Sequence, residues 1–429
     1  MTFIDFFAGV GGFRRGMELA GHKCVGFCEF DKYATASYTS MHLITDEQRE
    51  YLSTLDLRKR QKEILKDEYR NGEWYASDIR TVRAVDLPKA DCWCFGAPCQ
   101  DFSVAGKRAG LDGERSSLVR EIFRLLEETR EEDRPEWLLY ENVKGMLSSN
   151  RGFDYLAILL EMDRGGYDIE WQLLNSKHHG VPQNRERVYT VGHLRSRGST
   201  KIFPVTGADG EDSVCVEIKQ IGRDGTRKRD NPEAYRVYDA NGIAPTLTDM
   251  GGGGREPHIL YVIDKSYAGI ENGCVREYEN ECPTLSARDY KDPKCVVITV
   301  GNTNPSGRGQ NGNCYFSEGI NPAAQDRHGV GISVDTEKAP EYPGMYVQLS
   351  DEVVVYAIWY EKYQCYIAIR KLTPKECFRL QGWTDDYFEK AAFVNSDSQL
   401  YKQAGNGVTV SVVYEIARRM ADDEQHNTD

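Results

Sequence analysis

The stretch TFIDFFAGVGGFRRGMELAG, residues 2–21, joins an apolar run to a glycine-rich turn and then to a segment with helical periodicity. Residues 2–8 predict a strand, and the segment after Gly12 predicts a helix that ends at Gly21. A strand that runs through glycines into a helix is typical of nucleotide-binding turns, because glycine lets the backbone approach a ligand closely. The spacing is not G-x-G-x-x-G, so the turn alone leaves the ligand open, and a nicotinamide dehydrogenase also fits it.

Strand and helix patterns continue to alternate up to about residue 195. Strands are predicted in KCVGFCEF, ADCWCFGAP, EWLLYENV, IEWQLLNS and RVYTVGHL, and helices in DKYATASYTSMH, SSLVREIFRLLEETR and FDYLAILLEMDRGG. The alternation predicts an α/β fold with a doubly wound, mostly parallel sheet, in which ligands bind at the carboxyl ends of the strands. Residues 45–72 carry interleaved acids and bases and predict one or two solvated helices inserted into this pattern.

After residue 195 the chain is rich in Gly, Asn and Pro and contains short β-prone runs. A pattern of strand, Pro-Thr turn and strand recurs there, with Pro245, Pro283 and Pro322 about 38 or 39 residues apart. We therefore expect a second, smaller, β-rich domain. The predicted boundaries are 1–195 for a catalytic and cofactor-binding domain, 196–398 for a β-rich domain with repeats over about 217–335 and a return segment over about 366–398, and 399–429 for a segment that completes the first domain.

The overall composition is that of a soluble globular protein, with 40% hydrophobic and 28% charged residues and a formal net charge of -13. The 12 cysteines are scattered without a C-x-x-C pair, so we expect reduced, mostly buried thiols rather than a zinc ribbon or a redox motif. No apolar run approaches the roughly 20 residues that span a bilayer, and the first residues do not form a signal peptide. The negative charge argues against a general nucleic-acid coat but leaves room for a local basic groove.

Two carboxylates follow predicted strands at the points where those strands end. Glu29 lies about 20 residues beyond Gly9, where a carboxylate can accept hydrogen bonds from both hydroxyls of a ribose. Asp78 follows a third predicted strand and can accept a hydrogen bond from an adenine amino group. Together they fit an adenosine-containing cofactor, although each carboxylate alone fits a helix N-cap equally well.

Cys99 lies in the loop just beyond the strand that contains Cys92 and Cys94, and these two cysteines are predicted to be core residues. A cysteine at the end of a strand and close to a helix N-terminus is placed to act as a thiolate nucleophile. The run CWCFGAPC offers none of the usual metal-ligand spacings, so we expect no metal.

Three further side chains complete this predicted cleft. Glu141 ends the strand EWLLYENV and is expected to meet Cys99 above the sheet. Arg185 and Arg187 lie two residues apart at the start of a strand, and they therefore share one of its faces. The sequence thus predicts a thiol, a carboxylic acid and a pair of guanidinium groups around one cleft.

Six motifs, in their order along the chain, resemble those of the DNA (cytosine-5) methyltransferases of the bacterial or phage single-chain type: FFAGVGG, GAPCQDFSVAG, ENV, PQNRERVY, RKLTPKECFRLQGW and QAGNGV. The resemblance implies the Rossmann-like fold of S-adenosylmethionine-dependent methyltransferases and methylation of C5 of a flipped-out cytosine in a short specific sequence of double-stranded DNA. It implies that Cys99 attacks C6 of the base covalently while Glu141 assists at N3. It further implies that Arg185 holds the base carbonyl and that Arg187 orients the Cys99 loop or the carboxylate.

The same resemblance assigns a pocket for S-adenosyl-L-methionine, with S-adenosyl-L-homocysteine as the product. Phe7 would lie against the adenine and Glu29 would bind the ribose. The other implied cofactor residues are Ala8, Gly9, Gly11, Gly12, Phe30, Asp78, Ile79, Pro98, Leu118, Asn406 and Val408.

DNA contacts are implied for the loop after Cys99, whose glycines and basic side chains suit a mobile lid, and for the repeat region. Arg236 would lie near the bases and Thr246 would bind a phosphate, while Gly251 to Gly254 would let the backbone approach the DNA. The second repeat has matching residues, so the copy that reads the target stays open. The implied DNA-binding residues are Gln100, Ser103, Lys107, Arg108, Arg236, Thr246, Gly251, Gly252, Gly253, Arg276 and Thr284.

The implied partner is double-stranded DNA, with no membrane and with a monomer expected in the cytoplasm of a bacterium, encoded by the bacterium or a phage. The implied role is restriction-modification, beside a cognate restriction endonuclease, or protection of phage or host DNA. Three alternatives remain from the sequence. A nicotinamide dehydrogenase fits the glycine-rich turn alone and leaves GAPCQ unexplained. An RNA methyltransferase on the same scaffold would share the cysteine chemistry, and a catalytically silent DNA-binding module would share the fold.

Overall fold

The computed structural model describes residues 1–97, 118–198, 200–206 and 372–426, together with the strands of a second sheet between residues 220 and 371. The strands of the first sheet are β1 (Thr2–Phe6), β2 (Lys23–Cys28), β3 (Trp74–Ala76), β4 (Cys92–Phe95), β5 (Trp137–Val143), β6 (Tyr167–Asn175) and β7 (Glu186–Leu194). The helices are α1 (Gly12–Leu19), α2 (Lys32–His42), α3 (Asp46–Ser53), α4 (Leu57–Glu63), α5 (Val119–Glu128), α6 (Phe153–Arg164), α7 (Pro374–Arg379), α8 (Asp385–Ala392), α9 (Asp397–Asn406) and α10 (Val410–His426).

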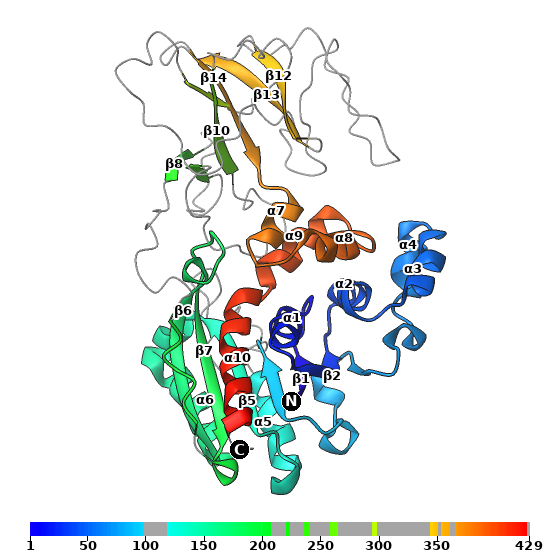
Figure 1. The fold of residues 1–429 in the computed structure, drawn as a ribbon, viewed down its shortest axis with the longest axis vertical. Helices are drawn as coiled ribbons and strands as arrows, with labels where there is room; N and C mark the ends of the chain where they lie inside the picture. Colours follow the sequence, from blue (N-terminus) through cyan, green and yellow to red (C-terminus); the bar gives the residue numbers. More distant parts are fainter. Residues whose placement is uncertain are drawn as a thin grey trace. The chain divides into compact units, whose positions relative to one another are not determined.

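The chain divides into two compact units. The first contains Met1–Cys215 and Thr373–Asp429, and the second contains Val216–Ala244 and Gly253–Leu372. The second unit therefore ends at Leu372, before the boundary at residue 398 that the sequence suggested, and helices α7 to α10 belong with the first unit (Figure 1).

The first unit is built on a seven-stranded sheet with the order β3-β2-β1-β4-β5-β7-β6. Strands β1 to β5 pair in parallel with their neighbours, whereas β7 is antiparallel to both β5 and β6. The predicted mostly parallel, doubly wound sheet is confirmed, and β7 is the one strand of this sheet that runs against the rest. Because the chain winds outward from β1 to β3 and then returns to β4, the switch point of the sheet lies between β1 and β4.

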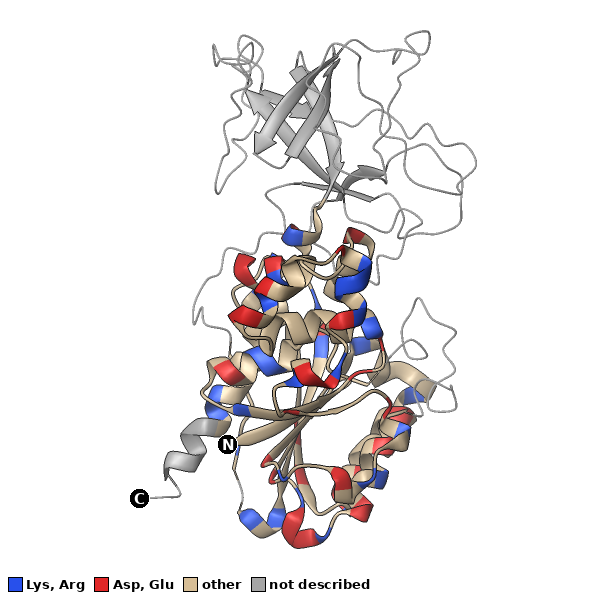
Figure 2. Ribbon diagram, turned by 90° about the vertical axis from the view of Figure 1, so that its right-hand side faces the viewer, with Lys and Arg blue, Asp and Glu red and all other residues tan. Residues whose placement is uncertain are grey.

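Helices cover both faces of this sheet. One hydrophobic cluster joins the strands to apolar residues of α5 and α6, and a second cluster joins the opposite face to α1 and α10. Figure 2 shows the strands mostly free of charged residues, while lysine, arginine, aspartate and glutamate are intermixed on the surrounding helices and loops. The predicted core positions Cys92 and Cys94 are fully buried in β4, as expected.

The charged insertion is helical, as predicted. Thr45 and Gln48 form a capping box at the start of α3, and Asp56 caps α4. Arg60 of α4 donates from Nη1 to the carbonyl of Phe393 at 2.6 Å and stacks on its ring, with the guanidinium carbon 4.0 Å from the ring centroid. The insertion therefore packs against the segment that follows α8.

The second unit contains a separate sheet, as the β-rich prediction requires. Its strands are β8 (Gln220–Arg223), β9 (Arg236–Asp239), β10 (His258–Asp264), β11 (Lys294–Val297), β12 (Gly344–Ser350), β13 (Val353–Tyr360) and β14 (Cys365–Lys371). The order is β12-β13-β14-β10-β9-β8, with β11 also paired to β10. In the first repeat, β9 and β10 are the two predicted strands on either side of the Pro-Thr turn, and they pair in parallel.

Candidate active site

The glycine-rich turn lies at the carboxyl end of β1, next to the switch point. Phe7 and Gly9 have positive φ angles of 55° and 56°, and Gly11 has a φ of 89°. A Cβ added at Gly9 would meet nothing within 4 Å, whereas one at Gly12 would lie 2.5 Å from the carbonyl oxygen of Val408. Glycine is thus required at Gly12 for close packing, while Gly9 faces open space in which a ligand can approach the backbone.

Glu29, directly after β2, braces this turn. Its Oε2 accepts a hydrogen bond from the Gly9 amide at 2.8 Å, and its Oε1 accepts one from the Asp31 amide at 2.7 Å. Burial raises the pKa of Glu29, and the two amides oppose this shift. Each carboxylate oxygen has a second lone pair, so Glu29 retains capacity for the ribose hydroxyls that the sequence assigned to it.

The other residues expected near an adenine differ in their surroundings. Phe30 is 75% exposed, whereas Phe7 is partly buried against the core and Ile79 is buried. Asp78 caps a short 3-10 helix by accepting from the Arg80 amide, and Arg80 Nη2 lies 2.7 Å from its Oδ2. The Arg80 side chain accordingly lowers the pKa of Asp78. Asp78 therefore has the helix-capping role that the sequence left open beside the cofactor role.

Gly96, the residue after β4, lies close to Glu141. Strands β4 and β5 pair in parallel, with Phe95 opposite Tyr140, so their carboxyl ends lie side by side. A Cβ added at Gly96, the residue after β4, would lie 3.5 Å from Glu141 Oε2. Gly96 is three positions before Cys99 in the sequence.

Glu141 forms an ion pair with Arg187 across β5 and β7. Arg187 Nε lies 3.1 Å from Glu141 Oε1, and the two side chains are only 13% and 10% exposed. The buried hydroxyl of Tyr189 lies near this pair, and burial followed by the charge of Glu141 raises the pKa of Tyr189 well above its usual value. The structure thus brings together two of the four predicted catalytic side chains.

Arg185 has a different environment, although it is only two residues away. It is 3% exposed, and it donates from Nη1 to the Gly405 carbonyl at 3.3 Å and from Nη2 to the Gly407 carbonyl at 2.7 Å. These carbonyls flank Asn406, whose side chain is exposed. Arg185 therefore ties β7 to the segment that carries one of the expected cofactor residues.

Two buried glutamines and one ion pair hold the segments around Arg185, Gly405 and Glu29 in place. These three interactions were not predicted from the sequence. Gln183 donates to the Leu380 carbonyl and Gln381 to the Ala404 carbonyl, both at 2.7 Å. Lys402 of α9 lies 2.5 Å from Asp31, which follows Glu29 and caps α2. The two glutamines lie inside the motifs PQNRERVY and RLQGW. Their position in these motifs is the one sequence signal that could have indicated a structural role for them.

Several predicted site residues lie outside the part of the chain that the structure describes. Leu118 is described at the start of α5, partly buried against the core. Of Arg236 only the backbone, at the start of β9, is described. The predictions outside the described residues are those for Pro98, Cys99, Gln100, Ser103, Lys107, Arg108, Thr246, Gly251, Gly252, Gly253, Arg276 and Thr284, and for the repeat prolines.

Neither a bilayer-spanning helix nor a metal site is found among the described residues. None of the helices described has the length and apolar character needed to cross a bilayer. Within the same part of the chain, no group of three or more histidine, cysteine, aspartate or glutamate side chains is placed to hold a metal ion. The described cysteines Cys24, Cys28, Cys92, Cys94 and Cys377 are all buried free thiols.

Comparison with known proteins identifies the family. The chain is 29% identical to the orphan methyltransferase M.SPRI of Bacillus phage SPR, over 98% of this chain and 97% of that protein. It is 25% identical to the type II methyltransferase M.DsaV of Dactylococcopsis salina, over 98% of this chain and 86% of that protein. The fold is similar to that of the Entamoeba histolytica methyltransferase EhMeth, with a TM-score of 0.55 at 12% identity, covering 99% of this chain and 98% of that one.

A family model agrees with these relatives. The model described as C-5 cytosine-specific DNA methylase matches residues 1–422, nearly the whole chain. The relatives, the fold and the order of the motifs all point the same way. The chain therefore belongs to the C-5 cytosine-specific DNA methylases and is a DNA (cytosine-5) methyltransferase.

Proposed function

We propose that the protein transfers a methyl group from S-adenosylmethionine to C5 of a flipped-out cytosine within a short specific sequence of double-stranded DNA. The observation that carries this proposal is the position of the buried Glu141–Arg187 pair beside Gly96, which follows β4 and lies three positions before Cys99 in the sequence. The glycine-rich turn follows β1, which pairs in parallel with β4. A nucleophile, an acid and a cofactor turn are thereby expected at one edge of the sheet.

The residues around the turn fit an adenosine-containing cofactor. Gly9 faces open space, Glu29 has free lone pairs beside it, and Phe30 presents a 75% exposed ring next to Glu29. We assign the ribose to Glu29 and the adenine to Phe7 and Phe30, with Asn406 at the end of α9 and Val408 just after it closing the pocket. When bound there, S-adenosylmethionine supplies the electrophilic methyl group.

The chemistry of the base explains why a thiol and an acid are needed together. Cytosine C5 becomes nucleophilic only after the conjugation of the ring is broken. The Cys99 thiolate adds to C6, and Glu141 supplies a proton or a hydrogen bond at N3, which leaves an enamine with electron density on C5. After C5 has been methylated, loss of its proton and expulsion of the Cys99 thiolate restore the aromatic ring.

The two arginines have separate tasks in this proposal. Arg187 holds the Glu141 carboxylate in place, as the sequence suggested for it. Arg185 was expected to hold the base carbonyl, and two of its guanidinium nitrogens already donate to the Gly405 and Gly407 carbonyls. We therefore propose that Arg185 positions the Gly405–Gly407 segment, beside the contact with the base carbonyl that the resemblance implies for it.

DNA recognition is assigned to the second unit and to the loop after Cys99. The target base is unreachable inside a stacked duplex, and extruding it costs a few kcal/mol. The loop residues Gln100, Ser103, Lys107 and Arg108 would close over the flipped nucleotide. The repeats, with Arg236, Thr246 and Gly251–Gly253 in the first copy and Arg276 and Thr284 in the second, would read the sequence.

The biological role proposed is restriction-modification or protection of phage or host DNA in the bacterial cytoplasm. The relatives support it through their printed names, which describe orphan phage and type II methyltransferases. We expect the protein to act as a monomer and without a metal ion. A cognate endonuclease would be a functional partner that cuts the same word.

The test is base-resolution mapping of 5-methylcytosine in unmethylated duplex DNA incubated with the protein and S-adenosylmethionine, with RNA as a parallel substrate. We expect methylation of one short word, or of two words if two repeats read DNA. Cys99→Ala should abolish methylation while cofactor binding, measured by calorimetry, is retained. Methylation of RNA alone, or substantial turnover by the Cys99 variant, would overturn the proposal.

A further inference from the structure

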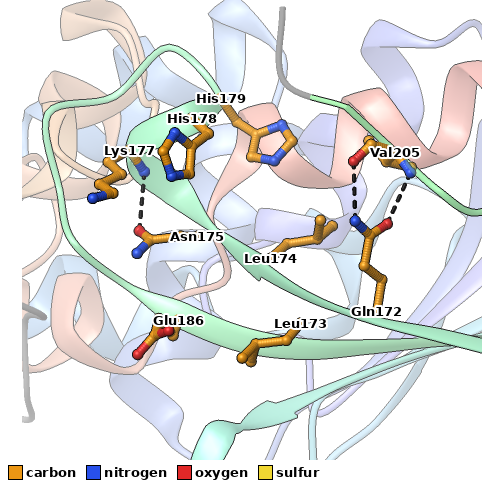
Figure 3. Close-up of a pocket in the computed structure, with 9 residues that line it drawn as sticks. All are labelled: Gln172, Leu173, Leu174, Asn175, Lys177, His178, His179, Glu186 and Val205. Carbon is orange, nitrogen blue, oxygen red and sulfur yellow. Dashed lines mark hydrogen bonds between the residues drawn. The ribbon is translucent and has the colours of Figure 1, made fainter. Parts of the chain in front are cut away.

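A pocket of about 430 Å³ lies apart from the residues assigned to catalysis and to the cofactor. It is formed by the end of β6, the 3-10 turn Ser176–His178 that follows, the start of β7 and Val205. Figure 3 shows the rings of His178 and His179 side by side at one margin of the pocket, with Glu186 at the opposite margin. None of the catalytic and cofactor residues named above lines it.

The side-chain groups of this pocket that have no hydrogen-bond partner among the described residues are nitrogen atoms of Lys177, His178 and His179. His179 is 4% exposed, and its buried Nδ1 has no hydrogen-bond partner among the described residues. In the same part of the chain, the structure records no ion pair or hydrogen bond for the Lys177 ammonium or the His178 ring. A buried polar group without a partner is costly, so an unpaired His179 nitrogen at a pocket points to a ligand.

The oxygen-bearing side chains of the pocket are already satisfied. Gln172 exchanges two hydrogen bonds with the backbone of Val205, at 2.8 and 3.2 Å. Both carboxylate oxygens of Glu186 lie within 3.0 Å of Lys144 Nζ, so the charge of Glu186 is compensated. The side-chain charge of the pocket that remains uncompensated is therefore the positive charge of Lys177, and an anion is the ligand that fits.

The pocket shares an edge and a face of the sheet with the catalytic pair. Leu174 in its floor is the register partner of Arg187, which in turn is the partner of Val143 on β5. Leu174 packs in the same cluster as Leu139, two residues before Glu141, so these side chains lie on one face. Strands in a sheet are about 4.8 Å apart, which places the floor of the pocket roughly 10 Å from the strand of Glu141.

We propose that this pocket binds a backbone phosphate of the DNA strand that carries the target cytosine. The inference rests on the proposed function, because it needs a DNA strand at Glu141. The floor of the pocket lies roughly 10 Å from the strand of Glu141, so a phosphate close to the flipped base along the same strand is the one within reach. Lys177 supplies the charge, and His178 and His179 supply hydrogen bonds.

The first test is the salt dependence of DNA binding by full-length Lys177→Gln. Removing one phosphate contact should reduce the slope of log K against log salt by about 0.9 and weaken specific and non-specific duplexes by a similar few-fold factor. The methylated word should not change, because phosphate contacts carry no direct sequence information. Lys23→Gln is the matched control, since Lys23 is exposed at the amino end of β2, four strands away from β7, and the slope of this variant should equal that of the native protein.

The second test locates the phosphate. Duplexes with a single neutral methylphosphonate linkage, moved one position at a time, should bind the native protein more weakly at one linkage, and Lys177→Gln should be insensitive to that linkage alone. His179→Gln, which retains hydrogen-bonding groups, should bind more tightly than His179→Phe. An unchanged slope in Lys177→Gln with no sensitive linkage would overturn the inference.

A DNA phosphate is distinguished from a free anion by thermal unfolding. If inorganic phosphate raises the melting temperature of the native protein but not of Lys177→Gln, while DNA binding is identical, the pocket takes free phosphate and the DNA assignment is wrong. Methylation by the native protein tests the proposed function, and the comparison of the native protein with Lys177→Gln tests the pocket. If the native protein methylates no DNA under any condition, the proposed function fails, whatever the variants show.

Discussion

Arg187 Nε lies 3.1 Å from Glu141 Oε1, and both side chains are almost completely buried at the carboxyl end of β5. Two residues before Arg187, and just before β7 begins, Arg185 donates to the Gly405 and Gly407 carbonyls instead. One arginine thus contacts the proposed acid, and the other contacts the segment that carries Asn406. Arginine is suited to both tasks because its planar fork offers five donors in a fixed geometry.

This division predicts different defects for Arg187→Gln and Arg185→Gln. Arg187→Gln leaves Glu141 without its charge partner, so kcat should fall by about 100- to 10,000-fold, the range typical of an impaired general acid. Cofactor affinity should remain close to that of the native protein. Arg185→Gln should instead weaken S-adenosylmethionine binding, because the Gly405–Gly407 segment loses its anchor. Calorimetry measures the cofactor affinity of each variant, and single-turnover experiments measure its rate of methyl transfer. If the two variants changed affinity and rate to the same extent, the separate roles of Arg185 and Arg187 would be contradicted.

The glycine-rich turn predicts a second pair of contrasting variants. Gly9 has a φ of 56° and open space at its Cβ position, so Gly9→Ala should cost about 1–2 kcal/mol of folding stability but should also weaken cofactor binding. Gly16 lies inside α1, where a Cβ would approach Val413 Cβ to 2.5 Å. Gly16→Ala should overpack the contact between α1 and α10 and destabilise the fold by about 1–3 kcal/mol.

Urea unfolding and cofactor titration separate these two glycines. Gly16→Ala should retain the cofactor affinity of the native protein under conditions in which it is folded. Native cofactor affinity in Gly9→Ala would show that the open space at Gly9 is not part of the cofactor site.

His42 predicts a dependence of stability on pH. It lies between the glycine-rich turn and α8, with Nε2 3.0 Å from the Val10 carbonyl, and Arg14, Arg15 and Lys390 are the nearby charges. Burial, followed by the charge of Arg14, lowers its pKa well below the usual value of 6.5. Above pH 6.5, His42 is neutral in both the folded and the unfolded protein. Below pH 6.5, the His42 side chain binds a proton in the unfolded protein but stays neutral in the folded protein.

The free energy of unfolding should therefore decrease as the pH falls from about 6.5 towards the lower folded-state pKa. His42→Gln should be less stable than the native protein at pH 8, and the difference should shrink at pH 5.5 because the variant lacks this proton. Denaturant unfolding at the two pH values measures it. A difference that is the same at both values would show that His42 does not titrate as described.

The assignment of the first repeat to target reading predicts the effect of Arg236→Ala. Arg236 begins β9, and each lost base contact should cost about 1–3 kcal/mol of discrimination. We expect weaker or relaxed choice of the methylated word, with an unchanged rate on the preferred word at saturating DNA. Methylation mapping checks this, and an unaltered pattern and affinity would transfer recognition to the second repeat, where Arg276→Ala is the corresponding variant.

The fold was largely predictable because its signals are local. The alternation of apolar runs and helical periods, and the glycines after residues 2–8, are readable from short windows of sequence. The direction of β7 could not be predicted in this way. The strand RVYTVGHL lies between β5 and β6 in the sheet because of pairing between distant parts of the chain, which no short window of sequence contains. The same is true of the division at Leu372, which depends on the packing of α8 against α2 and of α10 against α1, helices that lie far apart in the sequence.

The candidate site shows the same limit. The sequence brought Glu141, Arg185 and Arg187 to one cleft, but two arginines two positions apart cannot be distinguished by type or by face. Their contacts differ because Arg187 lies diagonally across from Glu141, while Arg185 meets a segment more than two hundred residues further along the chain. Asp78 caps a short 3-10 helix and pairs with Arg80, which its position in the sequence left open, while its contact with the adenine stays a prediction.

The most direct test of the central claim is to trap the covalent bond between Cys99 and the base. A duplex with 5-fluorocytosine at the target position has no C5 proton to lose after methylation, so the Cys99 thiolate cannot be expelled. With S-adenosylmethionine present, mass spectrometry of the digested complex should show the methylated fluoronucleotide on the peptide that contains Cys99. An adduct on another residue, or no adduct although the unmodified duplex is methylated normally, would contradict the account.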